Sequence, residues 1–140
     1  MAPGAIVFLD ANVLIRYLTG DHPDHSRRAL AFLQRVEAGA ATVTICEGVL
    51  VEVVQVLSSR RLYNQPREQI AAALGDILRL RGLHLPGKAL YLRALELYGR
   101  ENVDFVDALC VAHAERIGAN EIVSFDRDLD RFPSVRRVEP

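Results

Sequence analysis

The sequence predicts one α/β domain over residues 1–140, with three layers (α/β/α) around a central, doubly wound parallel sheet of four to five strands. Three observations predict this class. Short apolar runs without polar alternation are typical of strands buried on both faces of a parallel sheet. Helical patterns separate these runs, as the connections between parallel strands require. At 140 residues, half of them apolar, the chain can bury the core of one domain.

The predicted strands are short segments rich in branched and aromatic side chains, which favour strands. Their bounds are Ala5–Leu9, Thr42–Ile45, Glu121–Phe125 and Val135–Val138, with a weaker run at Leu83–Leu85 after Gly82. The carboxyl ends of parallel strands share one edge of a sheet, where ligands bind in such folds. Residues that follow the strands are therefore the first place to look for a site.

Helical spacing of apolar residues fills the segments between the strands. The predicted helices are Asp24–Glu37, Gly48–Leu57, Pro66–Leu80, Pro86–Tyr98 and Asp104–Ile117, with a further helix that begins near Asn12. Pro66 suits a helix start, and Gly118 is placed to end the last helix as its C′ residue.

Composition and cysteine spacing argue against a strongly basic nucleic-acid-binding protein and against a disulfide or zinc scaffold. The net charge of −1 indicates no overall attraction to polyanions, so nucleic-acid binding would depend on local patches or on metal ions. All basic residues except Lys88 are Arg, which suits phosphate binding but is equally explained by the nucleotide composition of the source. Cys46 and Cys110 lie in apolar segments without metal-site spacing, which predicts buried thiols in a reducing compartment.

The amino terminus, MAPGAIVFLD, has no basic segment before its short apolar run, and no other run reaches the length of a membrane span. A signal peptide and a membrane anchor are therefore not expected. The predicted location is the cytoplasm.

Two aspartates follow predicted strands directly. Asp10 ends the first strand and Asp126 ends the strand that begins at Glu121. Asp10 would serve equally well as the N-cap of the helix near Asn12. Asp128 and Asp130 follow at spacings that are also typical of turns.

Two further acids fall on predicted helices. Glu52 shares a ridge with Val49, Val53 and Val56, where an unpaired carboxylate would be desolvated unless an Arg or backbone donors compensate it. Asp107 lies on an otherwise apolar helix whose N-cap is predicted to be Asp104.

Convergence of these four acids would require a cation. Like charges about 4 Å apart repel by about 4 kcal/mol per pair at an effective dielectric near 20. Mg²⁺ and Mn²⁺ prefer oxygen ligands and retain waters and substrate phosphates. The sequence therefore predicts a divalent metal site that acts on phosphate groups.

The chain resembles PIN domains and, among them, VapC-type toxins of toxin–antitoxin pairs. The stretches that carry the resemblance are FLDANVLIRYLTGD, VLVEVVQVL and VDFVDALCVAHAERIGANEIVSFDRDL, and their order and separation match over essentially the whole chain. The resemblance implies that four acids hold Mg²⁺ or Mn²⁺ and are catalytic, and that other positions support them. The acids are Asp10, Glu52, Asp107 and Asp126, and the supporting residues are Asn12, Ser124, Asp104 and Asp128. Ala11 departs from the family, which commonly has Thr or Ser there.

The resemblance also implies an activity and partners. Family members resembling this chain are endoribonucleases that cut tRNA or other structured RNA, stop translation, form homodimers and are inhibited by a VapB-like antitoxin. Arg16 and Arg127 are candidates for contacts to substrate phosphates, or else surface ion-pair partners. Two alternatives stay open: a PIN-fold nuclease for RNA processing or DNA cleavage, and a non-catalytic metal-binding or receiver-like module.

Overall fold

The computed structural model describes residues 4–140, so the first three residues of the predicted domain lie outside the described part. The elements, in chain order, are β1 (Ile6–Phe8), α1 (Ala11–Thr19), α2 (Pro23–Glu37), β2 (Thr42–Thr44), α3 (Glu47–Ser58), α4 (Arg67–Leu78), α5 (Lys88–Arg100), α6 (Phe105–Ile117), β3 (Glu121–Val123), the 3₁₀ helix η1 (Arg127–Arg131) and β4 (Arg136–Val138). Each of the four main predicted strand runs contains an observed strand, and each predicted helix overlaps an observed one. The α/β class is confirmed.

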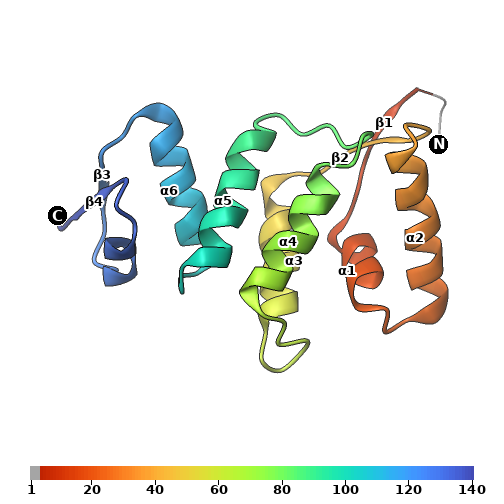
Figure 1. The fold of residues 1–140 in the computed structure, drawn as a ribbon, viewed down its shortest axis with the longest axis horizontal. Coiled ribbons are helices and arrows are strands. Elements are labelled where there is room, and N and C mark those ends of the chain that lie inside the picture. The colour runs from red at the N-terminus through yellow and green to blue at the C-terminus, as the bar shows by residue number, and fades with distance from the viewer. Residues whose placement is uncertain (1–3) are drawn as a thin grey trace.

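The strands of residues 4–140 form two separate parallel pairs instead of the predicted central sheet of four to five strands. β1 pairs with β2, and β3 pairs with β4. The weaker predicted strand, Leu83–Leu85, contributes a single parallel bridge between Val43 and Leu83. Figure 1 shows the two pairs near opposite ends of the long axis of the molecule.

The order of the helices explains this separation. α4 packs against α5, and α5 packs against α6, so the second half of the chain extends away from β1 and β2 (Figure 1). β3 and β4 follow α6 in the chain and lie on the side of α6 that faces away from α5 (Figure 1). Local apolar patterns specify where strands form, but they do not specify which strands pair with each other. The prediction of one central sheet is therefore corrected to two separate strand pairs.

A contiguous apolar core joins the helices to the β1–β2 pair. The fully buried side chains include Leu14 of α1, Val43 of β2, Leu50 of α3 and Leu74 of α4. The predicted helix end at Gly118 is confirmed, since this residue adopts the left-handed conformation with φ of 73°. Among the described residues, no helix combines the length and the apolar character needed to cross a membrane.

Two predictions of burial are wrong. Glu52 is exposed, because the stripe of α3 that faces the core consists of Leu50, Val53, Val54 and Leu57. Glu52 therefore lies beside this stripe and not within it. Cys46 and Cys110, predicted to be buried thiols, are also exposed.

An ion pair joins α5 to α6. Arg93 donates two hydrogen bonds to the carboxylate of Glu115, from Nε at 2.9 Å and from NH2 at 3.1 Å. These hydrogen bonds lower the pKa of Glu115, against an opposing effect of burial. The bidentate geometry makes this pair stronger than an ordinary surface contact.

We expect Glu115→Gln to lower the free energy of unfolding by up to about 1 kcal/mol at neutral pH. Because the folded-state pKa of Glu115 is lowered, its stabilisation is complete above the unfolded-state value, about 4.3, and disappears as the pH falls through the folded-state value. Urea unfolding at several pH values measures this difference. The matched control is Glu96→Gln, since Glu96 pairs with Arg93 on the exposed face of α5. A difference that persists in acid would contradict this account of the pair.

Candidate metal centre

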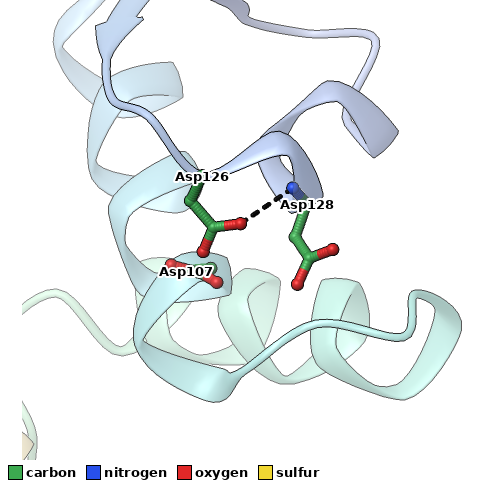
Figure 2. Close-up of side chains that lie close together, drawn as sticks. All are labelled: Asp107, Asp126 and Asp128. Atoms are coloured by element: carbon green, nitrogen blue, oxygen red, sulfur yellow. Dashed lines mark hydrogen bonds between the residues drawn. The ribbon is translucent and has the colours of Figure 1, made fainter.

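Three carboxylates converge where α6 meets the end of β3. One ligand oxygen from each of Asp107, Asp126 and Asp128 lies within 4.8 Å of the others. Figure 2 shows the three side chains gathered between the first turn of α6 and the start of η1. In the described part of the chain, this is the one group of three or more Asp, Glu, His and Cys side chains near enough to share an ion.

Helix α6 presents Asp107 at this point. Asp104 occupies the N-cap position in extended conformation, as predicted, but its side chain makes no capping hydrogen bond within residues 4–140. Asp107 is the third residue of the helix, so its carboxylate lies close to the positive end of the helix dipole. The partly buried carboxylate of Asp107 has no cationic partner among the described residues.

Two local hydrogen bonds fix the orientation of Asp126. Its backbone N–H donates to Oγ of Ser124 at 2.9 Å, and its Oδ1 accepts from the backbone N–H of Asp128 at 2.9 Å. One carboxylate oxygen of Asp126 is therefore engaged by the backbone, and the other points toward Asp107 (Figure 2). Ser124 thus holds the turn that presents Asp126.

The cluster is electrostatically strained without a cation. Burial raises the pKa of Asp107, and the negative charges of Asp126, Asp104 and Asp128 raise it further. Arg131 approaches Asp128 at 3.8 Å, which compensates only the outer member of the cluster. Hard divalent cations fit this all-oxygen donor set, because they bind carboxylates and offset their repulsion.

We expect Asp107→Asn to raise the free energy of unfolding by about 1 kcal/mol at neutral pH in a metal chelator, the water-screened Coulomb energy of charges about 4 Å apart. The raised pKa means that the charged form of Asp107 costs stability above its folded-state pKa. This cost vanishes below the unfolded-state value, about 3.9. Melting temperatures of variant and wild type measure the difference at both pH values. A less stable variant at neutral pH would show that the carboxylates do not repel.

The other two predicted acids lie elsewhere in this chain. Asp10 occupies the N-cap position of α1, is exposed, and makes no side-chain capping hydrogen bond in the described residues. Glu52 lies on the exposed face of α3. The structure thus brings Asp107 and Asp126 together and leaves Asp10 and Glu52 outside their cluster.

Asp10 borders a hollow of about 730 Å³ between β1, α1 and α2. Asn12 and Arg16 also line it, but within residues 4–140 no hydrogen bond joins Asn12 to Asp10. Arg16 pairs with Asp21 at 3.2 Å, as the ion-pair alternative for this residue predicts. Arg127, the first residue of η1, forms no ion pair in the described part of the chain.

The sequence predicted only a supporting role for Asp128. In the structure its carboxylate lies in the cluster with those of Asp107 and Asp126. The signal was present as the spacing Asp126-Arg127-Asp128. An aspartate that caps the N–H two residues later places the second carboxylate on the same side of the turn.

Comparison with known proteins gives concordant results. Residues 7–135 match the family described as PIN domain. The chain is similar to Ribonuclease VapC31 of Mycobacterium tuberculosis, with 31% identity over 140 residues that cover 94% of this chain and 96% of the relative. It is similar to Ribonuclease VapC25 of the same species, with 30% identity over 139 residues and the same coverage. A VapC ribonuclease of Aquifex aeolicus is 27% identical over 119 residues, 85% of this chain and 86% of the relative.

Proposed function

Because the chain belongs to the PIN domain family and is of the VapC type, we propose that it is a metal-dependent endoribonuclease and the toxin of a toxin–antitoxin pair. The observation that carries the proposal is the convergence of Asp107, Asp126 and Asp128. Relatives with the word ribonuclease in their names support RNA as the substrate. The proposed targets are tRNA or other structured RNA, whose cleavage stops translation.

The proposed ligands of Mg²⁺ or Mn²⁺ are the acids that the resemblance indicates, joined by the third member of the cluster. Asp107, Asp126 and Asp128 are the ligands that the cluster supports. Asp10 and Glu52 are proposed on the resemblance alone, because they lie outside the cluster in this structure. When bound there, a divalent cation lowers the pKa of a coordinated water and neutralises charge on a phosphate. The donor set suits either ion, because every ligand is a carboxylate oxygen.

The residues of the chain have separable roles in this proposal. Asp107 and Asp126 would hold the cation beside the scissile phosphate, which their own negative charge would otherwise repel. The hydrogen bonds from the backbone N–H groups of Asp126 and Asp128 keep this geometry fixed before substrate arrives, which lowers the cost of reorganisation during the reaction. Arg127, beside Asp126 and free of ion pairs in the described residues, is the proposed contact to a neighbouring phosphate.

The proposed partners follow from the same family membership. We propose a VapB-like antitoxin that covers the acidic cluster, a homodimer, and a cytoplasmic location. An antitoxin segment with Arg side chains would complement the charge of Asp107, Asp126 and Asp128.

Cleavage of RNA by the purified protein tests the function. Total tRNA is incubated with protein in Mn²⁺, in Mg²⁺ and in excess chelator, and the product ends are sequenced. The proposal predicts cleavage with either ion, none in chelator, and products with 5′-phosphate and 3′-hydroxyl ends. Cleavage that persists in chelator, or cyclic phosphate ends, would contradict the metal mechanism. Preferential cleavage of DNA would instead favour another nuclease role.

A further inference from the structure

The side chain of Arg137 on β4 is nearly covered although it carries a charge. It is 12% exposed, whereas the side chain of its neighbour Arg136 is 72% exposed. Arginine is rarely covered to this extent unless its guanidinium group is paired. The partners of Arg137 therefore indicate what this residue does in the fold.

Three oxygen atoms accept hydrogen bonds from this guanidinium group. Nε donates to Oδ1 of Asp130 at 3.0 Å, and Nη1 donates to the backbone carbonyl of Ser124 and to Oε1 of Glu139, each at 3.0 Å. Two of these partners, Ser124 and Asp130, lie at the two ends of one short segment. Arg137 therefore joins the ends of this segment, residues 124–130, which we call the acidic turn.

The acidic turn carries two of the three converging carboxylates. Asp126 and Asp128 lie within it, and each is two residues from the nearer end (Figure 2). The third carboxylate, that of Asp107, belongs to α6 and is held by that helix. The separation of the three carboxylates therefore depends on where the acidic turn lies relative to α6.

Apart from Arg137, few contacts attach the acidic turn to the rest of the described chain. The N–H of Ser124 donates to the carbonyl of Val138 on β4 at 2.9 Å, and Leu129 is the one buried residue of the turn. The hydrogen bonds that orient Asp126 lie within the turn itself, so they fix its shape and not its position. A segment with so little buried apolar area moves at low free-energy cost unless a side chain holds it.

We propose that Arg137 is a positioning residue of the metal centre, because it holds the acidic turn so that Asp126 and Asp128 face Asp107. This inference deepens the proposed metal-dependent function and rests on it. The planar guanidinium group suits the task, since its fixed fork of donors reaches a carbonyl and a carboxylate at once. An ammonium group on a flexible stem does not fix two oxygen atoms relative to each other in this way.

Charge and geometry predict opposite effects when Arg137 is replaced. A positive charge near a cation site repels the cation, so loss of the charge alone would tighten metal binding. Loss of the hold on the acidic turn would weaken binding, because the carboxylates would no longer be fixed near one another. The sign of the change in Mn²⁺ affinity therefore separates the two roles.

Titration with Mn²⁺, followed by electron paramagnetic resonance of the free ion, measures this sign. We expect Arg137→Gln to raise the Kd for Mn²⁺ by about tenfold, the lower end of the range for losing a residue that orients metal ligands. The matched control is Arg136→Gln, since Arg136 lies on the same strand and pairs with Glu121, outside the acidic turn. Because salt screens exposed charges, the control should change Kd by less than about twofold. An unchanged or lower Kd for Arg137→Gln overturns the proposal.

A conservative variant separates the fork of donors from the charge. Arg137→Lys keeps the positive charge and removes the fixed geometry, so its Kd should lie between those of the wild type and of Arg137→Gln. A Kd equal to that of the wild type would show that the charge alone suffices. That result would also overturn the positioning role.

Amide hydrogen exchange, measured by nuclear magnetic resonance without metal, tests the hold on the turn directly. In Arg137→Gln, exchange should accelerate at Asp126 and Asp128, whose N–H groups donate within the turn, and stay unchanged at Val111 inside α6. Equal acceleration at all three positions would show a general loss of structure and would overturn the proposal.

A second pair of variants serves if Arg137→Gln does not fold. Asp130→Asn and Glu139→Gln each remove one carboxylate that pairs with Arg137, but only Asp130 belongs to the acidic turn. Asp130→Asn should raise the Kd for Mn²⁺ and accelerate exchange at Asp126, and Glu139→Gln should do neither. Equal effects of the two variants would overturn the proposal.

The two measurements distinguish failure of this inference from failure of the proposed function. A wild type that does not deplete free Mn²⁺ would contradict the proposed function, and hydrogen exchange would still decide whether Arg137 holds the turn. If the wild type binds Mn²⁺ and Arg137→Gln binds it equally well, only the role of Arg137 is overturned.

Discussion

Replacing Asp107 with Asn is expected to lower kcat/KM for RNA cleavage by about 100-fold or more, because a metal centre contributes several kcal/mol to catalysis and each 1.4 kcal/mol corresponds to a factor of ten. Asn keeps the size of the side chain and removes only the charge. The loss should be accompanied by weaker dependence on Mn²⁺ concentration. Initial rates on one RNA substrate over a range of Mn²⁺ concentrations measure both effects.

The matched control for Asp107 is Asp76→Asn. Asp76 is exposed on α4 and lies outside the acidic cluster, so its replacement should change kcat/KM by less than about twofold. Because Asp107→Asn is also expected to be the more stable protein without metal, loss of activity cannot be attributed to unfolding. Equal activity of the Asp107 and Asp76 variants would exclude Asp107 from the site.

Replacing Gly82 with Ala is expected to cost more than about 3 kcal/mol of unfolding free energy and to lower the melting temperature by about 10 °C. A Cβ atom at position 82 would lie 2.2 Å from the carbonyl oxygen of Ala41 and 2.6 Å from that of Val36. Both are backbone atoms. Gly82 also donates to the carbonyl of Val36 at 2.9 Å and accepts from the N–H of Val43 at 2.8 Å, so neither side can move away without loss of a hydrogen bond.

Gly48→Ala provides the contrast in a thermal melt. Gly48 lies in the first turn of α3, and the nearest atom to an added Cβ would be Sγ of Cys46 at 3.9 Å, an ordinary contact. Ala favours helices over Gly by up to about 1 kcal/mol, so this variant should be as stable as the wild type or more stable. Similar losses for both variants would indicate that the close approach at Gly82 is relieved by local movement.

The sequence predicted the elements well because their signals are local. Gly118 at the end of α6 and the apolar runs at β1 and β3 depend on backbone conformation and on side chains within a few residues. The same holds for Asp104 at the start of α6, which the sequence pattern places correctly. These local signals do not depend on what each element later packs against.

The arrangement of the strands was not predictable in the same way. A single sheet requires a strand of the β1–β2 pair to lie beside a strand of the β3–β4 pair. β1 and β3 are separated by more than 110 residues, and no local pattern decides whether strands so far apart in the chain become neighbours. The predicted burial of Glu52 was wrong for a related reason. An almost continuous apolar run does not reveal which residues of α3 face the core. The cluster of Asp107 and Asp126 was predicted because both residues lie in one short, contiguous segment.

Binding of Mn²⁺ to the purified protein tests the metal centre most directly. Free Mn²⁺ is followed by electron paramagnetic resonance during titration of the wild type and of the double variant Asp107→Asn/Asp126→Asn. The metal centre predicts that the wild type depletes the signal of free Mn²⁺ and that the double variant leaves it unchanged. Equal depletion by the two proteins would show that the converging carboxylates do not hold the ion, and would contradict the account of the site.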